Sequence, residues 1–337
     1  MTGKIIRLAL RGLAGLAAAT LLAGFLSRLL PEAFPAGSTM DGISALRGQA
    51  IALALLASPA LLVSRDRGLA LAMGLGALGA LAATPELFHA EPVPPPGAAL
   101  SAPAGRDGES GGCPPLKAVT ANLFQWNRSA EAATRVLLDL DADLLVLQEP
   151  PARLRAPQGP LFRRYPHRLQ VDTGTAAAGP LLLSRRPLLA RHLGIGPKHA
   201  VATLDPGGPC ALTVATAHLD WPGTGAQGAE VEALAARLAA IHGPLAVMGD
   251  FNAAPWSRTL RQLSDRAGLR RRHRALGTYR GGAGGRGGAW FVPGGLPIDH
   301  ILTRPGLAAE SVRTIEIPGS DHLGLAATLR LTAAPPP

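Results

Sequence analysis

Aromatic residues and cysteines are scarce in this sequence of 337 residues: Phe, Trp and Tyr together make up 4%, and there are two cysteines. Two thiols cannot form the multi-cysteine cage of a structural zinc site. Cys113 and Cys210 are either one disulfide, if the part of the chain that contains them is exported, or two free thiols. With so few aromatic side chains, no combined aromatic and basic groove for a nucleic-acid polymer is evident.

Lysine is also rare, so nearly all of the positive charge is carried by arginine. From residue 117 onward there are 25 Lys and Arg against 16 Asp and Glu, a net charge of +9. This charge suits a phosphate-bearing or membrane-surface partner. Because arginine, alanine and glycine are frequent throughout the chain, part of the charge reflects general composition.

Charged residues are few in the first 90 residues, which contain three apolar windows, 13–26, 50–63 and 68–87. Each window approaches the length that a membrane-spanning helix needs, once flanking arginines are allowed to reach the interface. We therefore expect residues 1–90 to be a membrane region with about three transmembrane helices.

Two other interpretations of these windows remain open. The first window could be a cleaved signal peptide, because Lys4, Arg7 and Arg11 precede an apolar run. Each window could also be a buried helix of a soluble protein. Three successive Ala/Leu-rich runs without an amphipathic stripe disfavour the buried helices, and the two later windows favour a retained anchor.

Basic residues predict how the membrane region is oriented. One side is flanked by Lys4, Arg7, Arg11, Arg65 and Arg67, and the other only by Arg28 and Arg47. By the positive-inside rule the N-terminus is cytoplasmic, and everything after the third helix is outside. We expect a multi-pass protein of the cytoplasmic membrane with an extracytoplasmic domain.

The rest of the chain divides by composition. Residues 91–115 are rich in Pro, Gly and Ala, cannot pack a core and indicate a semi-rigid linker. Charged, aromatic and apolar residues are mixed over 116–332, as in a globular domain, and 333–337 are a Pro-rich tail. We expect any chemistry to lie in 116–332.

Two strand-like apolar runs, 117–124 and 144–148, end in polar side chains. Asn122 lies near the end of the first, Glu149 follows the second, and 129–140 between them has helical periodicity. A βαβ-like unit of this kind brings both side chains to the same edge of a sheet, where their oxygens can bind a hard cation such as Mg²⁺. Taken alone, Glu149 would more often be a surface residue after a strand.

Two further apolar runs deliver polar residues. The run 211–218 presents His218 at its end, where an isolated histidine is usually structural, and the run 245–248 leads into Gly249-Asp250-Phe251-Asn252. We expect Asp250 and Asn252 to point the same way from an extended segment. The carboxylate could orient a water or act as a base, and the amide could bond a phosphate oxygen. The alternative is a plain Asp/Asn turn.

Near the C-terminus, Asp299 interrupts a short apolar run and Asp321-His322 precedes an alternating one. Carboxylates buried in strands are costly unless they bind something. Asp321 could bind metal, and Asp299 could hold His322 in a working tautomer. A turn at a strand edge explains the Asp-His pair alone equally well.

Read together, these motifs resemble the successive signatures of the endonuclease/exonuclease/phosphatase superfamily. They are Ala121-Asn122-Leu123, Leu147-Gln148-Glu149, Leu183-Ser184-Arg185, Ala217-His218-Leu219, Gly249-Asp250-Phe251-Asn252, Ile298-Asp299-His300 and Ser320-Asp321-His322. The resemblance covers 117–332 and implies a four-layered α/β sandwich of two mixed β-sheets flanked by helices. It also implies that Glu149 is the principal Mg²⁺ ligand, that Asn122 and Asp321 lie near the metal, and that Mn²⁺ could replace Mg²⁺.

The same resemblance implies roles for the other polar residues. Asp250 orients or deprotonates the attacking water, and Asn252 contacts the scissile phosphate. His322, paired with Asp299, stabilises the phosphorane or serves as base. His218 binds the phosphate or assists the leaving group.

These features predict a membrane-anchored hydrolase of phosphodiester or phosphomonoester bonds that meets membrane lipids. A lipid-derived or other small substrate is favoured, because the domain shows no evident aromatic and basic groove for a polymer. No DNA-penetrating loops are recognisable, which disfavours a base-excision role. A membrane-tethered nuclease acting on DNA or RNA is the alternative. Two further alternatives are not enzymes. One is a non-catalytic membrane scaffold, and the other is a membrane protein whose tail only binds a partner through the arginines of 258–274.

Overall fold

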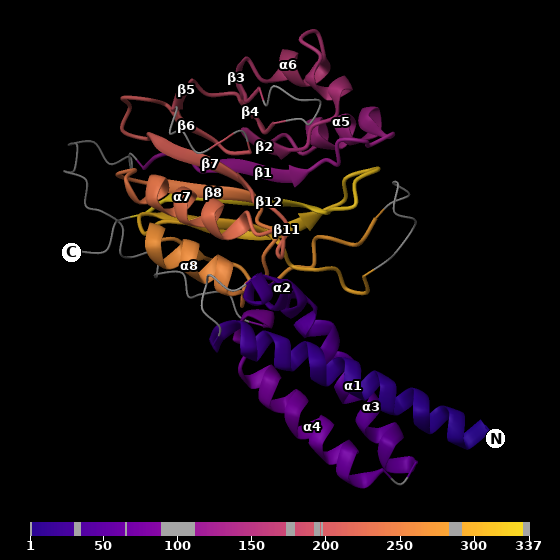
Figure 1. The fold of residues 1–337 in the computed structure, drawn as a ribbon. Helices are drawn as coiled ribbons and strands as arrows, with labels where there is room; N and C mark the ends of the chain where they lie inside the picture. Colours follow the sequence, from indigo (N-terminus) through magenta and orange to yellow (C-terminus); the bar gives the residue numbers. More distant parts are fainter. Residues whose placement is uncertain are drawn as a thin grey trace.

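The computed structural model describes residues 2–29, 35–64, 66–88, 112–172, 179–191, 196, 198–282 and 292–332. In it a helical N-terminal region, residues 2–88, lies against one side of a larger α/β domain (Figure 1). The predicted linker, the Pro-rich tail and most of the Gly-rich stretch after residue 280 fall outside the described residues.

The elements of the helical region are α1 (Thr2–Leu29), α2 (Pro35–Ile43), the 3₁₀ turn η1 (Ser44–Leu46), α3 (Arg47–Val63), α4 (Arg67–Ala82) and the 3₁₀ turn η2 (Pro85–Leu87). The predicted windows 13–26 and 50–63 each lie within a helix, whereas the window 68–87 extends beyond α4 into the turn η2. By length and composition two stretches, Lys4–Ser27 and Ser38–Val63, could cross a membrane, and α4 is a shorter apolar helix. The short helix α2 was not predicted.

Small residues predominate in the contact between the helices, and many large apolar side chains face outward. The contact is made by Ala14, Ala17, Ala50, Ala54, Ala70 and Ala77 together with Leu61 and Met73. Leu16, Leu56, Val63 and Leu71 are 62%, 77%, 86% and 63% exposed. Close contact through small residues, with large apolar side chains outside, is common in helices that pack in lipid.

Two mixed β-sheets form the centre of the α/β domain. The first has the order β11-β12-β1-β2-β4-β3 and the second β5-β6-β7-β8-β10-β9. The first sheet comprises β1 (Leu116–Asn122), β2 (Leu144–Gln148), β3 (His167–Gln170), β4 (Leu181–Ser184), β11 (Leu307–Ile315) and β12 (Gly324–Leu331). The second comprises β5 (Leu188–Arg191), β6 (Ala200–Leu204), β7 (Leu212–His218), β8 (Leu245–Asp250), β9 (Arg270–Arg271) and β10 (Asp299–Thr303). Among the described strands, β1–β2 and β7–β8 are the pairs that run parallel.

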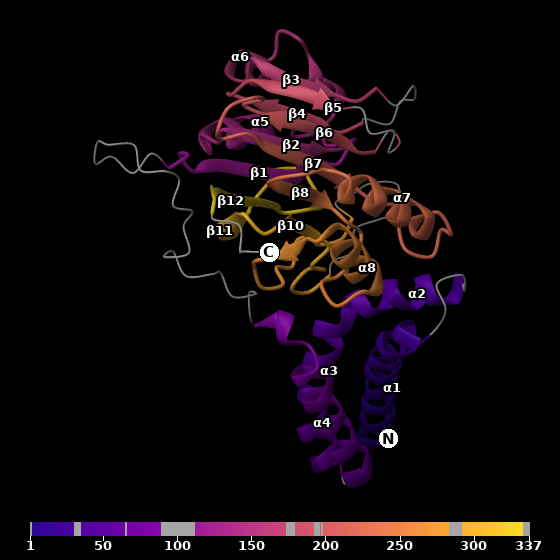
Figure 2. The ribbon, with the colours of Figure 1, turned by 90° about the vertical axis from the view of Figure 1, so that its left-hand side faces the viewer.

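Helices cover the outer face of each sheet, as Figures 1 and 2 show. They are α5 (Ala130–Asp139), the turn η3 (Ala152–Arg155) and α6 (Pro160–Arg164) on the first sheet, and α7 (Gln227–Ala239) and α8 (Arg258–Ala267) on the second. The predicted four-layered α/β sandwich is therefore confirmed. In β2, Leu144 and Val146 face the other sheet, whereas Leu145 and Leu147 face the helices. Burial on both faces explains why the central strands are continuous apolar runs.

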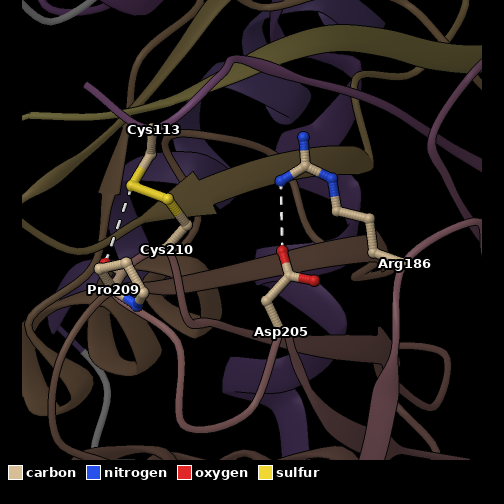
Figure 3. The surroundings of a disulfide bond; sticks show 5 residues. All are labelled: Cys113, Arg186, Asp205, Pro209 and Cys210. Atoms are coloured by element: carbon tan, nitrogen blue, oxygen red, sulfur yellow. Dashed lines mark hydrogen bonds and ion pairs between the residues drawn. A yellow bond between two sulfur atoms is a disulfide. The ribbon is translucent and has the colours of Figure 1, made fainter. Parts of the chain in front are cut away.

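A disulfide resolves the alternatives for the two cysteines. Cys113 and Cys210 are bonded, with their Cα atoms 5.5 Å apart, and Figure 3 shows the bond beside the Arg186–Asp205 ion pair. The bond ties the chain just before β1 to the turn between β6 and β7. Disulfides persist in oxidising compartments, which agrees with an exported domain.

Strand register brings the predicted polar residues to one end of the sandwich. In the first sheet Asn122 pairs with Gln148, so the next residue, Glu149, lies beside the end of β1. In the second sheet Asp250 is flanked by His218 on one neighbouring strand and by Asp299 on the other. The two sheets thus present their polar strand ends to each other.

Candidate active site

Glu149 lies at the centre of this polar end. Its Oε1 accepts a hydrogen bond from Asn122 Nδ2 at 3.2 Å and lies 3.4 Å from His218 Nε2, and its Oε2 accepts from the Gln125 amide at 3.2 Å. Burial by itself raises the pKa of Glu149, but the bonds from His218 and Asn122 outweigh burial and lower it to about 2. The carboxylate is therefore ionised at every physiological pH.

The backbone is strained at two of the predicted site residues. Glu149 has φ +47° and Asn252 has φ +46°, in the left-handed region that residues other than glycine rarely adopt. Such conformations persist only where the surroundings impose them, and they concentrate at functional sites. The same conformation occurs outside the site at Asp141, Asp205 and Ser311, so it agrees with a functional role without distinguishing it from a plain turn.

Asn122 links the two sheets across the site. Its amino group donates to Glu149 Oε1 and to Asp250 Oδ2, both at 3.2 Å, and its oxygen accepts from the Phe124 amide at 3.0 Å. The amide therefore presents its nitrogen to the two carboxylates. In this arrangement Asn122 orients Glu149, and its oxygen, which accepts one hydrogen bond, keeps a second lone pair for a cation.

Asp250, Asp299 and His322 form a buried cluster, with one ligand atom of each within 4.8 Å of the others. His322 Nδ1 lies 2.8 Å from Asp299 Oδ2 and its Nε2 lies 3.7 Å from Asp250 Oδ2. Burial would lower the pKa of His322, but Asp299 and Asp250 outweigh it and raise that pKa to about 10. The expected pairing of His322 with Asp299 is present, and the imidazole is a cation.

Burial and the charge of Asp299 raise the pKa of Asp250 to about 6. This carboxyl group therefore changes its charge close to neutral pH, as a general base must. One of its oxygens, Oδ1, accepts from the Asn252 amide at 2.9 Å. The other faces His322 and Asn122, so the Asp250 carboxylate is fixed from both sides.

The prediction that Asp250 and Asn252 extend in the same direction is wrong. The strand ends at Asp250, and the left-handed Asn252 turns the chain. Asn252 Nδ2 donates to the Leu219 carbonyl at 2.8 Å, while its buried Oδ1 has no hydrogen-bond partner. The group of this amide that lacks a partner is thus an acceptor, which suits a water O–H better than a phosphate oxygen.

Gly249 has the close backbone approach that the sequence predicts. Its φ is +146°, and a Cβ atom on it would lie 2.1 Å from the Ala217 carbonyl oxygen. Only glycine fits at this position. Gly249 therefore allows β7 and β8 to deliver His218 and Asp250 side by side.

His218 and Asp321 complete the predicted set. His218 faces Glu149, and although burial lowers its pKa, the hydrogen bond with that carboxylate and the charge of Asp250 raise it. Burial raises the pKa of Asp321, and the charges of Glu149 and Asp299 raise it further. All eight predicted residues are brought to one end of the sandwich.

The sequence model described as "Endonuclease/Exonuclease/phosphatase family" matches residues 119–322, more than half of the chain. The chain belongs to this family. Every predicted site residue, from Asn122 to His322, lies within the matched range. Members of the family hydrolyse phosphate esters.

Several solved structures are similar to this chain at low sequence identity. An endonuclease/exonuclease/phosphatase from Beutenbergia cavernae is 17% identical over 66% of this chain and 72% of that chain, with a TM-score of 0.47. The Neisseria 3′ phosphatase NExo bound to a product DNA hairpin is 20% identical over 63% and 98%, with a TM-score of 0.49. Sphingomyelinase C from Streptomyces griseocarneus is 16% identical over 64% and 99%, with a TM-score of 0.43. No curated protein matches the sequence.

The donor set of this family member fits a hard divalent cation. Glu149 and Asp321 supply carboxylate oxygens, the ligands that Mg²⁺ and Mn²⁺ prefer. The neighbouring carboxylates raise the pKa of Asp321, so they repel one another, and a cation would relieve that repulsion. Asp250, Asp299 and His322 also offer ligand atoms within 4.8 Å of one another, but a metal there would have to displace the proton of His322, whose pKa is raised to about 10.

Sequence reasoning missed an aromatic wall of the site. The Tyr279 ring lies 4.9 Å from the His322 ring, and the half-exposed Trp221 meets Tyr279 edge-on at 5.6 Å. Ser320 was also missed: its Oγ donates to the Asn122 carbonyl at 2.7 Å and accepts from the His322 amide. Tyr279 follows no periodic run, so no sequence pattern pointed to it. Ser320 lies next to Asp321 and His322, and that motif was the signal that could have identified it.

Proposed function

We propose that this chain is a membrane-anchored, divalent-cation-dependent hydrolase of phosphate esters. The observation that carries the proposal is a protonated His322 held between Asp299 and Asp250, at the same end of the sandwich as the ionised Glu149, which lies beside His218. Cationic and anionic groups preorganised in one buried site are what the transfer of a phosphoryl group to water requires.

Each residue of the site then has a chemical task. The Asp250 carboxylate accepts a proton from a water that the Asn252 oxygen helps to orient, and the water oxygen attacks phosphorus. The protonated His322 donates a hydrogen bond to a non-bridging phosphate oxygen as negative charge grows there. The bond between phosphorus and the ester oxygen breaks, and His218 supplies the proton to the leaving oxygen.

Glu149 and Asp321 would hold the cation, and Asn122 would keep Glu149 oriented. When bound, Mg²⁺ or Mn²⁺ neutralises phosphate charge as a Lewis acid. The strained backbone of Glu149 agrees with this role, because it fixes the carboxylate at the end of β2.

Anchoring in a membrane is supported by the outward-facing leucines of the helical region and by its charge distribution. Arg11 Nε lies 2.6 Å from Asp66 Oδ2, so the start of α1 and the turn between α3 and α4 are at the same end. The α/β domain contacts the opposite end, where α2 lies. With the basic end in the cytoplasm, the domain is extracytoplasmic, in agreement with the disulfide.

For the substrate we favour a lipid-derived or other small phosphate ester. A site carried next to a bilayer meets head groups at high effective concentration. A nucleic acid is the second candidate, because Trp126 is 68% exposed and follows Gln125, whose amide binds Glu149. Exposed tryptophans beside a basic domain can stack nucleic-acid bases.

Full-length protein in detergent tests the activity. We expect hydrolysis of bis-p-nitrophenyl phosphate that is lost with a chelator and restored by Mg²⁺ or Mn²⁺. Glu149→Ala should lower kcat by about a thousandfold or more, while Glu131→Ala, an exposed carboxylate on α5, should match the parent protein. Full activity of folded Glu149→Ala would refute the site.

The same preparation distinguishes the substrates. Phospholipid vesicles, plasmid DNA and RNA are incubated in parallel with Mg²⁺ at physiological salt, where non-specific electrostatic binding of nucleic acid is weakened. Release of head group or phosphate from vesicles supports the lipid assignment. Rapid nicking of plasmid with untouched vesicles would make the protein a membrane-tethered nuclease.

A further inference from the structure

The short helix α2 and the turn η1 lie directly against the α/β domain in both views of the ribbon (Figures 1 and 2). Asp41 of α2 is buried, with 4% of its surface exposed. Its Oδ1 accepts from the Arg258 amide at 2.8 Å and its Oδ2 from the Thr259 amide at 3.1 Å. A residue of the helical region therefore caps the N-terminus of α8.

This cap satisfies amides that the helix cannot bond internally. The first amides of any helix lack an internal partner, and a carboxylate there also interacts favourably with the helix dipole. At α8, Ser257 Oγ accepts from the Leu260 amide at 3.0 Å. Asp41 accepts from the amides of Arg258 and Thr259, which precede Leu260. The local Ser cap is incomplete without the contribution of Asp41.

A second contact fixes the same loop. Trp256 is buried, and its Nε1 donates to the Ser44 carbonyl at 2.7 Å. Its ring packs with Ala45 of η1 and Ala254, and the Arg47 guanidinium lies 5.5 Å from the ring centre. Residues 251–257, which run from Asp250 to α8, are thus held at their far end by α2, η1 and the start of α3.

The helical region also contacts the other loops of the site. Ser38 Oγ accepts from the Gly223 amide at 2.8 Å, three residues after Asp220 and two after Trp221. Gln49 Nε2 donates to the Pro293 and Gly295 carbonyls, on the segment that leads into Asp299. Three loops of the site therefore rest on one docked segment.

From these contacts we propose that Asp41 is a positioning residue for the hydrolytic reaction. Docked on α8, it holds the loop that carries Asp250 and Asn252, so the helical region is part of the active-site scaffold and not only an anchor. The inference rests on the proposed function, because it concerns the same site. Displacement of reacting groups by about 1 Å can cost 100-fold in rate.

The test uses full-length protein in detergent with bis-p-nitrophenyl phosphate and Mg²⁺, since this soluble substrate needs no membrane to reach the site. We expect Asp41→Ala to lower kcat about 10- to 100-fold with a smaller change in KM. Asp41→Asn keeps one acceptor oxygen but turns an amino group toward the second amide, so it should recover only part of the rate. The control Asp66→Ala removes a carboxylate of the same region that pairs with Arg11, and should behave like the parent protein.

Hydrogen exchange of the Arg258 and Thr259 amides gives a readout that needs no activity. Both should exchange faster in Asp41→Ala and remain protected in Asp66→Ala. Trp256→Phe removes the hydrogen bond to Ser44 and keeps most of the aromatic ring. It should also lower kcat, and it tests the docking if Asp41→Ala folds poorly. Parent-like kcat in folded Asp41→Ala or in Trp256→Phe would overturn the positioning role, as would equal losses in Asp66→Ala.

Failure of the proposed function is distinguishable from failure of this inference. If the parent protein hydrolyses no phosphate ester, the proposed function fails, while exchange at Arg258 and Thr259 still reports whether Asp41 caps α8. If the parent is active and the Asp41 variants are equally active, only the positioning role fails.

Discussion

Gly249 shows how a single residue determines the geometry of the site. A Cβ atom there would lie 2.1 Å from the Ala217 carbonyl oxygen, and the φ of +146° is unfavourable for any other residue. We expect Gly249→Ala to destabilise the protein by about 2 to 4 kcal/mol and to lower kcat, because Asp250 is the next residue. Thermal unfolding in detergent measures the first effect.

The matched control is Gly228→Ala on α7, where an added Cβ meets nothing within 4 Å. Alanine favours a helix more than glycine does, so this variant should be unchanged or slightly more stable. Equal unfolding temperatures for the two variants would show that the approach of β8 to β7 is not as close as described.

The charges of Asp250 and His322 predict a pH profile. Asp250 works as a base only when ionised, and its pKa is raised to about 6, so activity rises with pH up to that range. A bound cation favours the ionised form of Asp250 and therefore moves the acidic limb of the profile to lower pH. His322 works as a cation, and its pKa is raised to about 10, so activity falls as the pH approaches that value. Asp250 and His322 interact, so the apparent pKa of each limb is a property of the pair and not of one residue.

Asp299→Asn should move both limbs of the profile of kcat/KM to lower pH. The Asp299 charge raises the pKa of His322 and also that of Asp250, so its removal lowers both. Asp139→Asn, an exposed position on α5, is the control and should leave the profile unchanged. Unmoved limbs in Asp299→Asn would mean that Asp250 and His322 are not the titrating groups.

Among the elements, the disulfide joins the start of β1 to the turn between β6 and β7, 97 residues apart in sequence. Such a cross-link restricts the unfolded chain, and its loss should cost about 2 to 5 kcal/mol. We expect Cys113→Ser with Cys210→Ser to unfold at a lower temperature than the parent, with kcat unchanged because the bond is not part of the site. A reducing agent should lower the parent's unfolding temperature and leave the double variant unaffected.

The central strands could be predicted from sequence because they are buried on both faces. The run 144–148 coincides with β2, and the runs before His218 and Asp250 coincide with β7 and β8 to within a few residues. The residues at their ends could be assembled into one site only through resemblance to a family, because the contact between Asn122 and Asp250 joins the two sheets and no local pattern reports it.

Contacts between distant elements account for what could not be predicted. Asp41 is an isolated carboxylate between apolar segments, and nothing near it in sequence indicates that it caps a helix at residue 258. Tyr279 lies outside any strand or helix, so neither its type nor its spacing points to His322. The turn at Asn252 was misjudged because an apolar strand continues by default as an extended chain, whereas here the Asp250 carboxylate bonds the Asn252 amide and bends it.

At the scale of the whole molecule, the docking of the helical region changes how the active site relates to the membrane. A domain on a free linker could move far from the bilayer, whereas contacts through Asp41, Ser44 and Gln49 hold it at one end of the helices. With the membrane anchoring proposed above, these contacts would carry the site at a defined height above the membrane surface. Such an arrangement would favour esters that are presented at that surface.

Sidedness is the last prediction, and it follows from the two ends of the helical region. Lys4, Arg7, Arg11 and Arg67 belong to the end away from the α/β domain. By the positive-inside rule that end is cytoplasmic, and the α/β domain is outside. Alkaline phosphatase fused after Pro337 should therefore be active, and a fluorescent protein that folds only in the cytoplasm should be dark there. Both reporters inserted after Asp66, in the turn between α3 and α4, should give the opposite signals. A fluorescent C-terminal fusion without phosphatase signal would reverse the topology, and the disulfide would then have to form in a reducing compartment.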